Sequence, residues 1–185
     1  ALPHEIDHLA NLRPLAERGC DRVLAISSVG SLSAELAVGS FLCPDDFIAL
    51  HLNLSLFNDE RAHTAPGFNP EWRRDVISAW REDGRPLRES GVYWQTIGPR
   101  FETPAEIRLI AAHASVIGMT LASECVIAGE LGLAYAAICV VDNLANGIGA
   151  APLSVEELEA DRARNAKLLC EGLAATLPRL GAVGA

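Results

Sequence analysis

The chain has 185 residues, half of them hydrophobic and 21% charged, with a formal net charge of −9. This length suits a single domain, residues 1–185, with a substantial core, and the apolar content excludes a largely disordered chain. The acidic balance argues against a nucleic-acid partner, because little here would neutralise phosphates in bulk. No apolar run reaches the roughly 18 residues of a membrane span, so no membrane partner is expected. Five scattered cysteines without a CxxC pair indicate reduced thiols in a cytoplasmic protein, with neither a disulfide framework nor a metal site.

The N-terminal part predicts a helix followed by a strand. Apolar residues recur at helical spacing over residues 3–19. His4 and His8 lie one turn apart in this helix and suit either a metal pair or a solvated, capping pair; the lack of an evident third ligand favours the second. Residues 21–26 form a nearly continuous apolar run, which is typical of a central parallel strand. The following segment, residues 27–31, is interpreted as a turn, either an ordinary Ser-rich one or one whose N–H groups and hydroxyls bind an anion.

A strand, a long loop and a helix are predicted between residues 41 and 80. A second strand is predicted over residues 41–50, with an interruption at Pro44. Residues 51–67 are polar and irregular, which predicts a long loop, and loops of this length are usually functional or mobile. An amphipathic helix follows over residues 71–80, with its two tryptophans on the buried face.

A strand-to-helix turn in the middle of the chain is the first candidate binding segment. Residues 92–97 predict a strand, and a Thr-Pro-Ala-Glu sequence then predicts a capped helix over residues 103–113. Phe101 and Glu102 lie between them, where open α/β sheets bind ligands. An aromatic face beside a carboxylate suits a flat heterocycle with ring N–H groups. The alternative is that Phe101 is a core residue and Glu102 a favourable helix-start charge.

The C-terminal part predicts two further strands and two helices. A strand over residues 115–117 precedes a helix over residues 122–130. Residues 133–141 are the most apolar run and predict a strand buried on both faces. Polar residues follow at its C-terminal end, where they are positioned for binding. A second capping box predicts a last helix from Ser154 to about Leu177, whose charged residues are interpreted as a solvated face.

The segment Gly98–Ile107 resembles the base-binding segment of trimeric purine nucleoside phosphorylases and of the related methylthioadenosine and methylthioinosine phosphorylases. The resemblance implies an α/β fold with three layers around a central mixed, mostly parallel twisted sheet. Family members begin with a glycine-rich phosphate loop and an Arg-His segment that these residues do not contain, so the N-terminal part of the fold is expected to be lacking. The similarity continues in the same order through Ala10-Asn11-Leu12, Val29-Gly30-Ser31-Leu32, Gly118-Met119-Thr120, Glu124, Glu130-Leu131-Gly132 and Asp142-Asn143.

The resemblance also implies the roles of individual residues. Asn143 and Glu102 would be the catalytic residues on the base, and Phe101 would stack against it. By the resemblance His8 could touch the ribose. His63 would either reach into a neighbouring subunit's pocket or be an ordinary surface histidine. The other implied substrate-binding residues are Met119, Ser28, Val29, Glu124 and Val155, and the implied phosphate-binding residues are Ser27, Ser28 and Thr120.

Two residues decide which purine is expected. The amide of Asn143 can donate to O6 and accept from N7–H, and Glu102 can accept from N1–H. Adenine-preferring relatives carry a carboxylate and a small hydroxyl residue at these positions. Asp142 directly precedes Asn143, so an alternative alignment shifted by one residue would place a carboxylate on the base instead of the amide. Apolar Val155 and Leu158 near the 5′ carbon would favour a methylthio or deoxy group.

These inferences predict phosphorolysis of inosine, guanosine or 5′-methylthioinosine. Phosphate is the expected co-substrate, and neither a cofactor nor a metal is expected. The alternatives are a 5′-methylthioadenosine phosphorylase, a nucleosidase, or a non-catalytic homologue, because the N-terminal phosphate site is missing. The resemblance further implies a homotrimer or a dimer of trimers.

Overall fold

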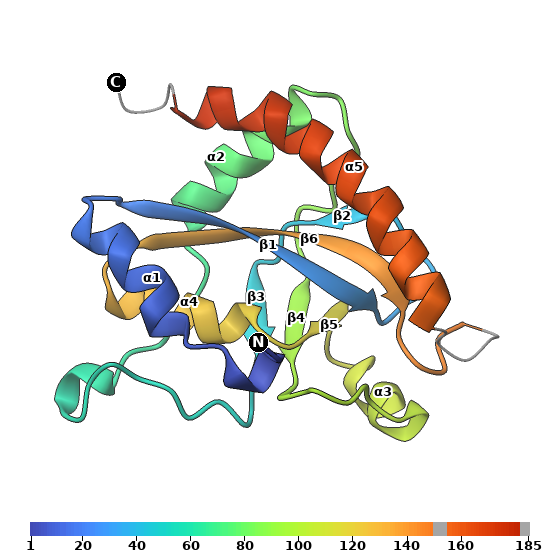
Figure 1. Ribbon diagram of the computed structural model, residues 1–185, viewed down its shortest axis with the longest axis horizontal. Coiled ribbons are helices and arrows are strands. Elements are labelled where there is room, and N and C mark those ends of the chain that lie inside the picture. The colour runs from blue at the N-terminus through green and yellow to red at the C-terminus, as the bar shows by residue number, and fades with distance from the viewer. Residues whose placement is uncertain (150–154, 182–185) are drawn as a thin grey trace.

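The computed structural model describes residues 1–149 and 155–181, without the side chains of Val155 and Glu157. Within these residues one curled sheet runs through the molecule, with the strand order β2-β6-β1-β5-β4-β3 (Figure 1). The strands are β1 (Arg22–Ser31), β2 (Phe41–Leu42), β3 (Asp46–Ile48), β4 (Val92–Gln95), β5 (Val116–Gly118) and β6 (Ala134–Leu144).

The sheet is mixed and mostly parallel, as expected. β1 and β6 run parallel along nearly their whole lengths, and β3, β4 and β5 are parallel to one another. Two antiparallel pairings complete the sheet: β5 with the end of β1, and the short β2 with β6.

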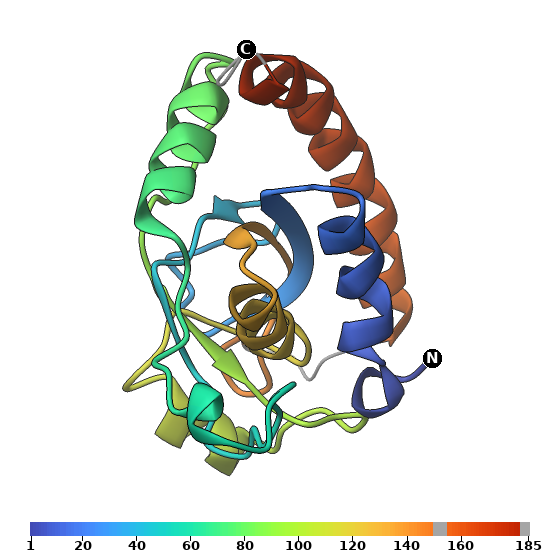
Figure 2. The ribbon, with the colours of Figure 1, turned by 90° about the vertical axis from the view of Figure 1, so that its left-hand side faces the viewer.

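Helices cover both faces of the sheet and make a three-layer α/β fold. α2 and α5 pack on one face, and α1 and α4 pack on the other (Figures 1 and 2). α3 packs at the end of the sheet where β5 and β1 meet. The helices are η1 (Pro3–Glu5), α1 (His8–Glu17), η2 (Glu60–Ala62), α2 (Pro70–Arg81), α3 (Pro104–Ile110), α4 (Leu121–Glu130) and α5 (Val155–Gly181).

β6 is the core strand, and its prediction as a strand buried on both faces is confirmed. Because successive side chains of a strand point to opposite faces, β6 contributes side chains to two apolar clusters, one on each face of the sheet. Ala136, Ile138 and Val140 pack with the tryptophans of α2, whereas Cys139 and Val141 pack with α1 and α4.

Three local predictions are wrong, and tertiary contacts explain each difference. The single helix predicted over residues 3–19 is η1 followed by α1, because the Asp7 side chain caps α1 and accepts from the N–H of Ala10 at 2.9 Å. His8 is not solvated but only 7% exposed, because α1 packs on α4. The turn predicted at residues 27–31 is the end of β1, where β6 provides the pairing partners.

The other elements lie close to their predicted positions. The region from residue 41 to 50 divides at the predicted interruption into β2 and β3, which lie at opposite edges of the sheet. α3 has the predicted capping box between Thr103 and Glu106. The predicted capping box of the last helix begins at Ser154, which lies outside the described residues.

Within residues 1–149 and 155–181, every helix is too short or too polar to cross a membrane.

The contact between α2 and α5 leads to a prediction about stability. A Cβ added at Gly172 would lie 2.7 Å from Cη2 of Trp80, which is fully buried. Alanine gains roughly 1 kcal/mol over glycine in a helix, but overpacking a dense core costs about 1–3 kcal/mol. We therefore expect Gly172→Ala to lower the free energy of unfolding by up to about 2 kcal/mol in urea titrations.

Gly129→Ala is the matched control in α4, because an added Cβ there meets nothing within 4 Å. It should raise the free energy of unfolding by roughly 0.5–1 kcal/mol. Equal stabilisation by both substitutions would show that Trp80 does not constrain α5.

Candidate functional site

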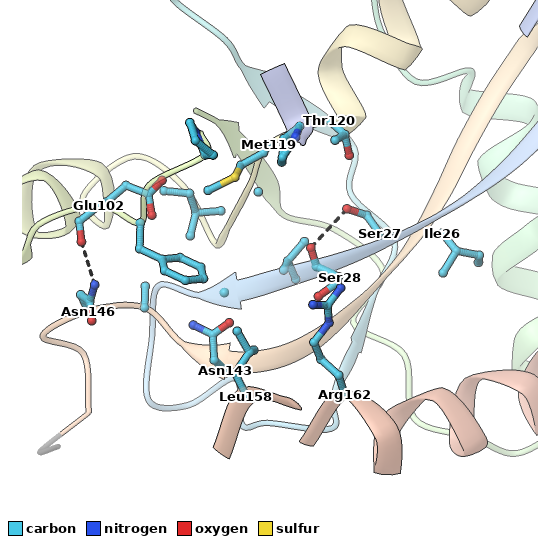
Figure 3. A pocket seen from close by; sticks show the side chains of 18 residues that line it. Ile26, Ser27, Ser28, Glu102, Met119, Thr120, Asn143, Asn146, Leu158 and Arg162 are labelled. Carbon is cyan, nitrogen blue, oxygen red and sulfur yellow. Dashed lines mark hydrogen bonds between the residues drawn. The ribbon is translucent and has the colours of Figure 1, made fainter. Parts of the chain in front are cut away.

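A cavity of about 360 Å³ opens at the C-terminal ends of β1 and β6 (Figure 3). Its walls come from the end of β1, the turn after β4, the β5–α4 junction, the segment after β6, and α5. These segments are far apart in the sequence and meet only through the sheet. The cavity brings together nine of the residues to which the sequence analysis gave a place in the site: Ser27, Ser28, Val29, Phe101, Glu102, Met119, Thr120, Asn143 and Leu158.

A β-bulge decides which residue of β6 faces the cavity. The register with β1 shifts so that Val29 pairs with Val141 but Gly30 pairs with Asn143, which leaves Asp142 as the extra residue. Bulges re-aim side chains in this way next to binding sites. Asn143 lines the cavity, whereas Asp142 is 3% exposed and accepts from Nδ2 of Asn165 in α5 at 2.8 Å. Of the two neighbouring residues that the sequence left open, Asn143 therefore faces the cavity and Asp142 does not.

The carboxamide of Asn143 is held from two sides. Its Nδ2 donates to the carbonyl oxygen of Leu144 at 2.9 Å. On the other side, a Cβ added at Gly30 would lie 3.3 Å from Nδ2 and 3.2 Å from Cγ2 of Ile117. Glycine at position 30 leaves room for the amide at this short distance, and the bond to Leu144 sets the orientation of the amide before any ligand arrives.

Glu102 is buried, with 8% exposure, at the other side of the cavity. Oγ1 of Thr96 donates to its Oε1 at 2.6 Å, and Nδ2 of Asn146 donates to its carbonyl oxygen at 2.8 Å. The second bond ties the turn after β4 to the segment after β6. Phe101 beside it is 45% exposed, so the alternative that Phe101 is a core residue is wrong.

An ion pair supports this turn from outside. Both guanidinium nitrogens of Arg100 donate to the carboxylate of Glu106, at 2.8 and 2.9 Å. The hydrogen bond from Arg100 lowers the pKa of Glu106 to about 2. The carboxylate therefore stays ionised and keeps its second contact, the capping bond from the N–H of Thr103 at 2.7 Å.

Met119 and Thr120 are positioned by the β5–α4 junction. The backbone N–H of Thr120 donates to the buried hydroxyl of Tyr93 at 3.3 Å. Gly98 has φ +70°, and a Cβ added there would lie 2.6 Å from Sδ of Met119. The turn after β4 and Met119 therefore pack directly against each other along one wall of the cavity.

Three of the residues singled out in the sequence do not line the cavity. Glu124 lies behind it and accepts from the hydroxyl of Tyr135 at 2.6 Å, with Nδ1 of His8 4.0 Å from its other oxygen. Burial lowers the pKa of His8, although the charge of Glu124 opposes this shift. His63 is exposed at the end of η2. The side chain of Val155 lies outside the described residues.

α5 contributes a residue that the sequence did not indicate. Leu158 and Arg162 both line the cavity, one turn apart. The sequence pattern assigned Arg162 to a solvated face, and it is indeed 57% exposed, but its Nε lies 4.0 Å from Oδ2 of Asp142. Figure 3 shows Arg162 and Glu102 at opposite ends of the cavity. The packing of α5 against β6 brings Arg162 to the cavity. Helical periodicity cannot predict this, because it shows which side of a helix is polar but not what lies next to that side.

The side chains of the cavity suit binding and electrostatic stabilisation. The Ser27 hydroxyl donates to the carbonyl oxygen of Ser28 at 3.5 Å, so it is not paired with a general base as a covalent nucleophile would be. In the part of the chain that the structure describes, no three His, Cys, Asp or Glu side chains form a group that could hold a metal. What remains is an aromatic face, an amide, a carboxylate, hydroxyls and one guanidinium around a concave space.

Comparison with known proteins identifies the family. Residues 2–178 match the model of the Phosphorylase superfamily. The probable 6-oxopurine nucleoside phosphorylase of Archaeoglobus fulgidus is 39% identical over 166 residues, covering 89% of this chain and 68% of the relative. The probable S-methyl-5′-thioinosine phosphorylase of Methanothermobacter thermautotrophicus is 37% identical over 158 residues, covering 84% of this chain and 56% of the relative.

A solved structure shows the same fold. Methylthioadenosine phosphorylase from Schistosoma mansoni, in complex with adenine, matches with a TM-score of 0.86 and 22% identity, over 98% of this chain and 72% of that one. This chain thus spans between about half and three quarters of the lengths of these three proteins. The match to the family model and the similarity to the two relatives show that the chain belongs to the Phosphorylase superfamily.

Proposed function

We propose that the protein catalyses phosphorolysis of the N-glycosidic bond of a 6-oxopurine nucleoside, such as inosine, guanosine or 5′-methylthioinosine. The products are the free base and a pentose 1-phosphate. The observation that carries this proposal is the convergence of Asn143 and Glu102 on one cavity beside Phe101. The printed names of the Archaeoglobus and Methanothermobacter relatives support the same substrate class.

The hydrogen-bonding pattern favours a 6-oxopurine over adenine. Nδ2 of Asn143 has a second N–H that can donate to O6, and its Oδ1 can accept from a protonated N7. Oε1 of Glu102 is held by Thr96, and Oε2 is the oxygen available to accept from N1–H. Adenine presents an unprotonated N1, which would face a buried carboxylate lone pair to lone pair. Sites built for particular donors reject such analogues strongly, because their polar groups are left unpaired.

The mechanism needs charge stabilisation rather than a covalent intermediate. A phosphate oxygen forms a bond to C1′ while the bond from C1′ to N9 breaks, and the bonding electrons leave with the purine. Positive charge develops on the ribose and negative charge on the base. Asn143 stabilises the base at N7 and O6, and it is fixed beforehand by Gly30 and Leu144. Preorganised donors of this kind are most effective because they need no reorganisation during the reaction.

The lining of the cavity bears on the 5′ group of the substrate. Leu158 and Met119 give the cavity an apolar part, which favours 5′-methylthioinosine among the candidate substrates.

The cysteines bear on the cellular compartment. Burial raises the pKa of the Cys43 thiol to about 11 and that of Cys125 to about 12, so both stay protonated and unreactive. All five cysteines are free, which supports a reducing, cytoplasmic location.

Base release in the presence and absence of phosphate tests the proposed reaction. We expect the protein to release base from inosine, guanosine and 5′-methylthioinosine only when phosphate is present, as measured by chromatography of the free base. Equal release without phosphate would indicate a nucleosidase instead. Release from 5′-methylthioadenosine alone would contradict the roles given to Asn143 and Glu102, and no release from any nucleoside would indicate a non-catalytic homologue.

Removing the amide tests the role of Asn143 directly. Loss of a preorganised donor to a developing negative charge lowers kcat by about 10²–10³-fold, and we expect Asn143→Ala to do so with inosine. Asn53→Ala is the matched control, because Asn53 is exposed in the loop before η2 and does not line the cavity. Similar rates for the two variants would remove Asn143 from the reaction.

We also propose that the protein assembles as a homotrimer, the state that its family resemblance implies. An apolar surface beside the cavity supports assembly. Leu50, Ile97 and Leu109 are 75%, 57% and 66% exposed and line one hollow of about 430 Å³. Exposed apolar patches of this kind mark interaction sites. The prediction that His63 reaches a neighbouring subunit's site depends on this assembly.

A charge placed in this hollow should weaken the assembly. We expect Leu109→Glu to shift the protein toward monomers in light scattering after size-exclusion chromatography, because the carboxylate would be buried without a partner. Leu177→Glu serves as the control, since Leu177 is 51% exposed on α5 and outside the hollow. An unchanged mass for the Leu109 variant would place the interface elsewhere.

A further inference from the structure

We propose that Asn165 is a positioning residue, which holds Asp142 in the packing against α5 and so keeps the amide of Asn143 directed at the base. The proposal rests on the proposed phosphorolysis and adds to it a residue that lies outside the cavity lining. Asn165 belongs to α5 and is 0% exposed. Because it does not reach the cavity, any effect it has on the reaction passes through residues that do.

Both donors of the Asn165 amide are used at the register shift of β6. Its Nδ2 donates to the carbonyl oxygen of Val141 at 3.1 Å and to Oδ1 of Asp142 at 2.8 Å. A carbonyl oxygen and an ionised carboxylate both accept only, which fixes the end of the amide that faces them. Val141 is the last residue before the shift in pairing with β1, and Asp142 is the extra residue. One side chain thus holds the backbone before the shift and the side chain at it.

The side chains of β6 continue to alternate through the shift. Val141 packs in the cluster that includes residues of α1 and α4, Asp142 contacts α5, and Asn143 lines the cavity. While Asp142 stays bonded in the layer of α5, the next side chain is directed to the other face of the sheet. Release of Asp142 would let this end of β6 rotate and would move the amide of Asn143 away from the base.

Packing alone does not explain an amide at position 165. Oδ1 of Asn165 is buried and has no hydrogen-bond partner within residues 1–149 and 155–181. It lies close to Gly39, where an added Cβ would be 3.4 Å away. A buried polar atom without a partner destabilises a fold, and an apolar side chain would avoid that cost. The two bonds that the amide donates to β6 are therefore its distinguishing contribution.

The fold does not depend on Asn165 alone. The carbonyl oxygen of Val141 also accepts from the N–H of Gly39 at 2.8 Å. Loss of the amide therefore leaves this part of the backbone paired. It leaves the Asp142 side chain with its 4.0 Å contact to Arg162. Variants at position 165 should consequently fold, and their defect should appear in the site.

A double-mutant cycle with Asn143 tests the proposal. Asn165→Leu keeps a branched side chain but removes both donors. We expect it to lower kcat for inosine phosphorolysis by about 10- to 100-fold, because small misplacements of a catalytic group have effects of this size. The KM for inosine should change little, since the misplaced group acts mainly in the transition state. In the Asn143→Ala background the same substitution should lower kcat no further, because the group that it positions is absent.

The rival explanation is that Asn165 only stabilises the core. In that case its loss would lower kcat by the same factor with and without Asn143, and this result would overturn the proposal. Asn165→Ala is the second variant, because it cannot overpack against Gly39, and its kcat should fall in the same way. Gly172→Ala is the matched control on α5, since it perturbs the packing on Trp80 and does not touch the cavity. The kcat of this control should equal that of the unmodified protein.

A spectroscopic measurement without substrate keeps this test separate from the test of the reaction. The NMR signals of the Asn143 side-chain N–H groups, identified by their absence from Asn143→Ala, report on the bond to Leu144. In both variants at position 165 these signals should move toward those of a free amide, and in Gly172→Ala they should stay in place. Unchanged signals in both variants would overturn the proposal, whatever the kinetics. Displaced signals in a protein that releases no base would sink the proposed reaction and leave the positioning role in place.

Discussion

The parallel pairing of β1 and β6, interrupted by one bulge, is the interaction on which the site depends. The two strands run together along the core, and the register shift leaves Asp142 as an extra residue between the pairs Val29–Val141 and Gly30–Asn143. Asn143 consequently points into the cavity, and Asp142 points into the packing between the sheet and α5. At this irregularity an amide lines the cavity, and the neighbouring carboxylate lies 4.0 Å from the guanidinium of Arg162.

The site is a meeting of segments that the sheet brings together. The turn after β4 supplies Glu102 and Phe101, and the end of β6 supplies Asn143. Asn146, just after β6, donates a hydrogen bond to the carbonyl oxygen of Glu102 and so joins the two segments. Glu102 and Asn143 each have a hydrogen-bond partner that fixes the direction of the side chain: Thr96 donates to Glu102, and Asn143 donates to the carbonyl oxygen of Leu144. Preorganisation of this kind is the physical basis for choosing one purine over another, because a wrong base leaves these groups unpaired.

Local sequence predicted those elements that local physics decides. The capping box at Thr103, the apolar run of β6 and the buried tryptophans of α2 were all visible in the sequence, since capping bonds and burial patterns depend on residues close in the chain. Local reasoning failed where a distant partner decided the outcome. Residues 27–31 extend as strand because β6 pairs with them, and His8 is buried because α4 covers it.

The same distinction between local and long-range interactions applies to the candidate site. By itself the sequence determined which residue types could recognise a flat oxygenated base, and it placed Phe101, Glu102 and Asn143 at the ends of strands, where α/β sheets bind ligands. The tertiary structure alone decided that Asn143 rather than Asp142 faces the cavity, and that Arg162 belongs to it. The physical reason is that strand register and helix packing are set by contacts between segments more than a hundred residues apart in the chain, such as β1 with β6. No pattern within one segment carries that information.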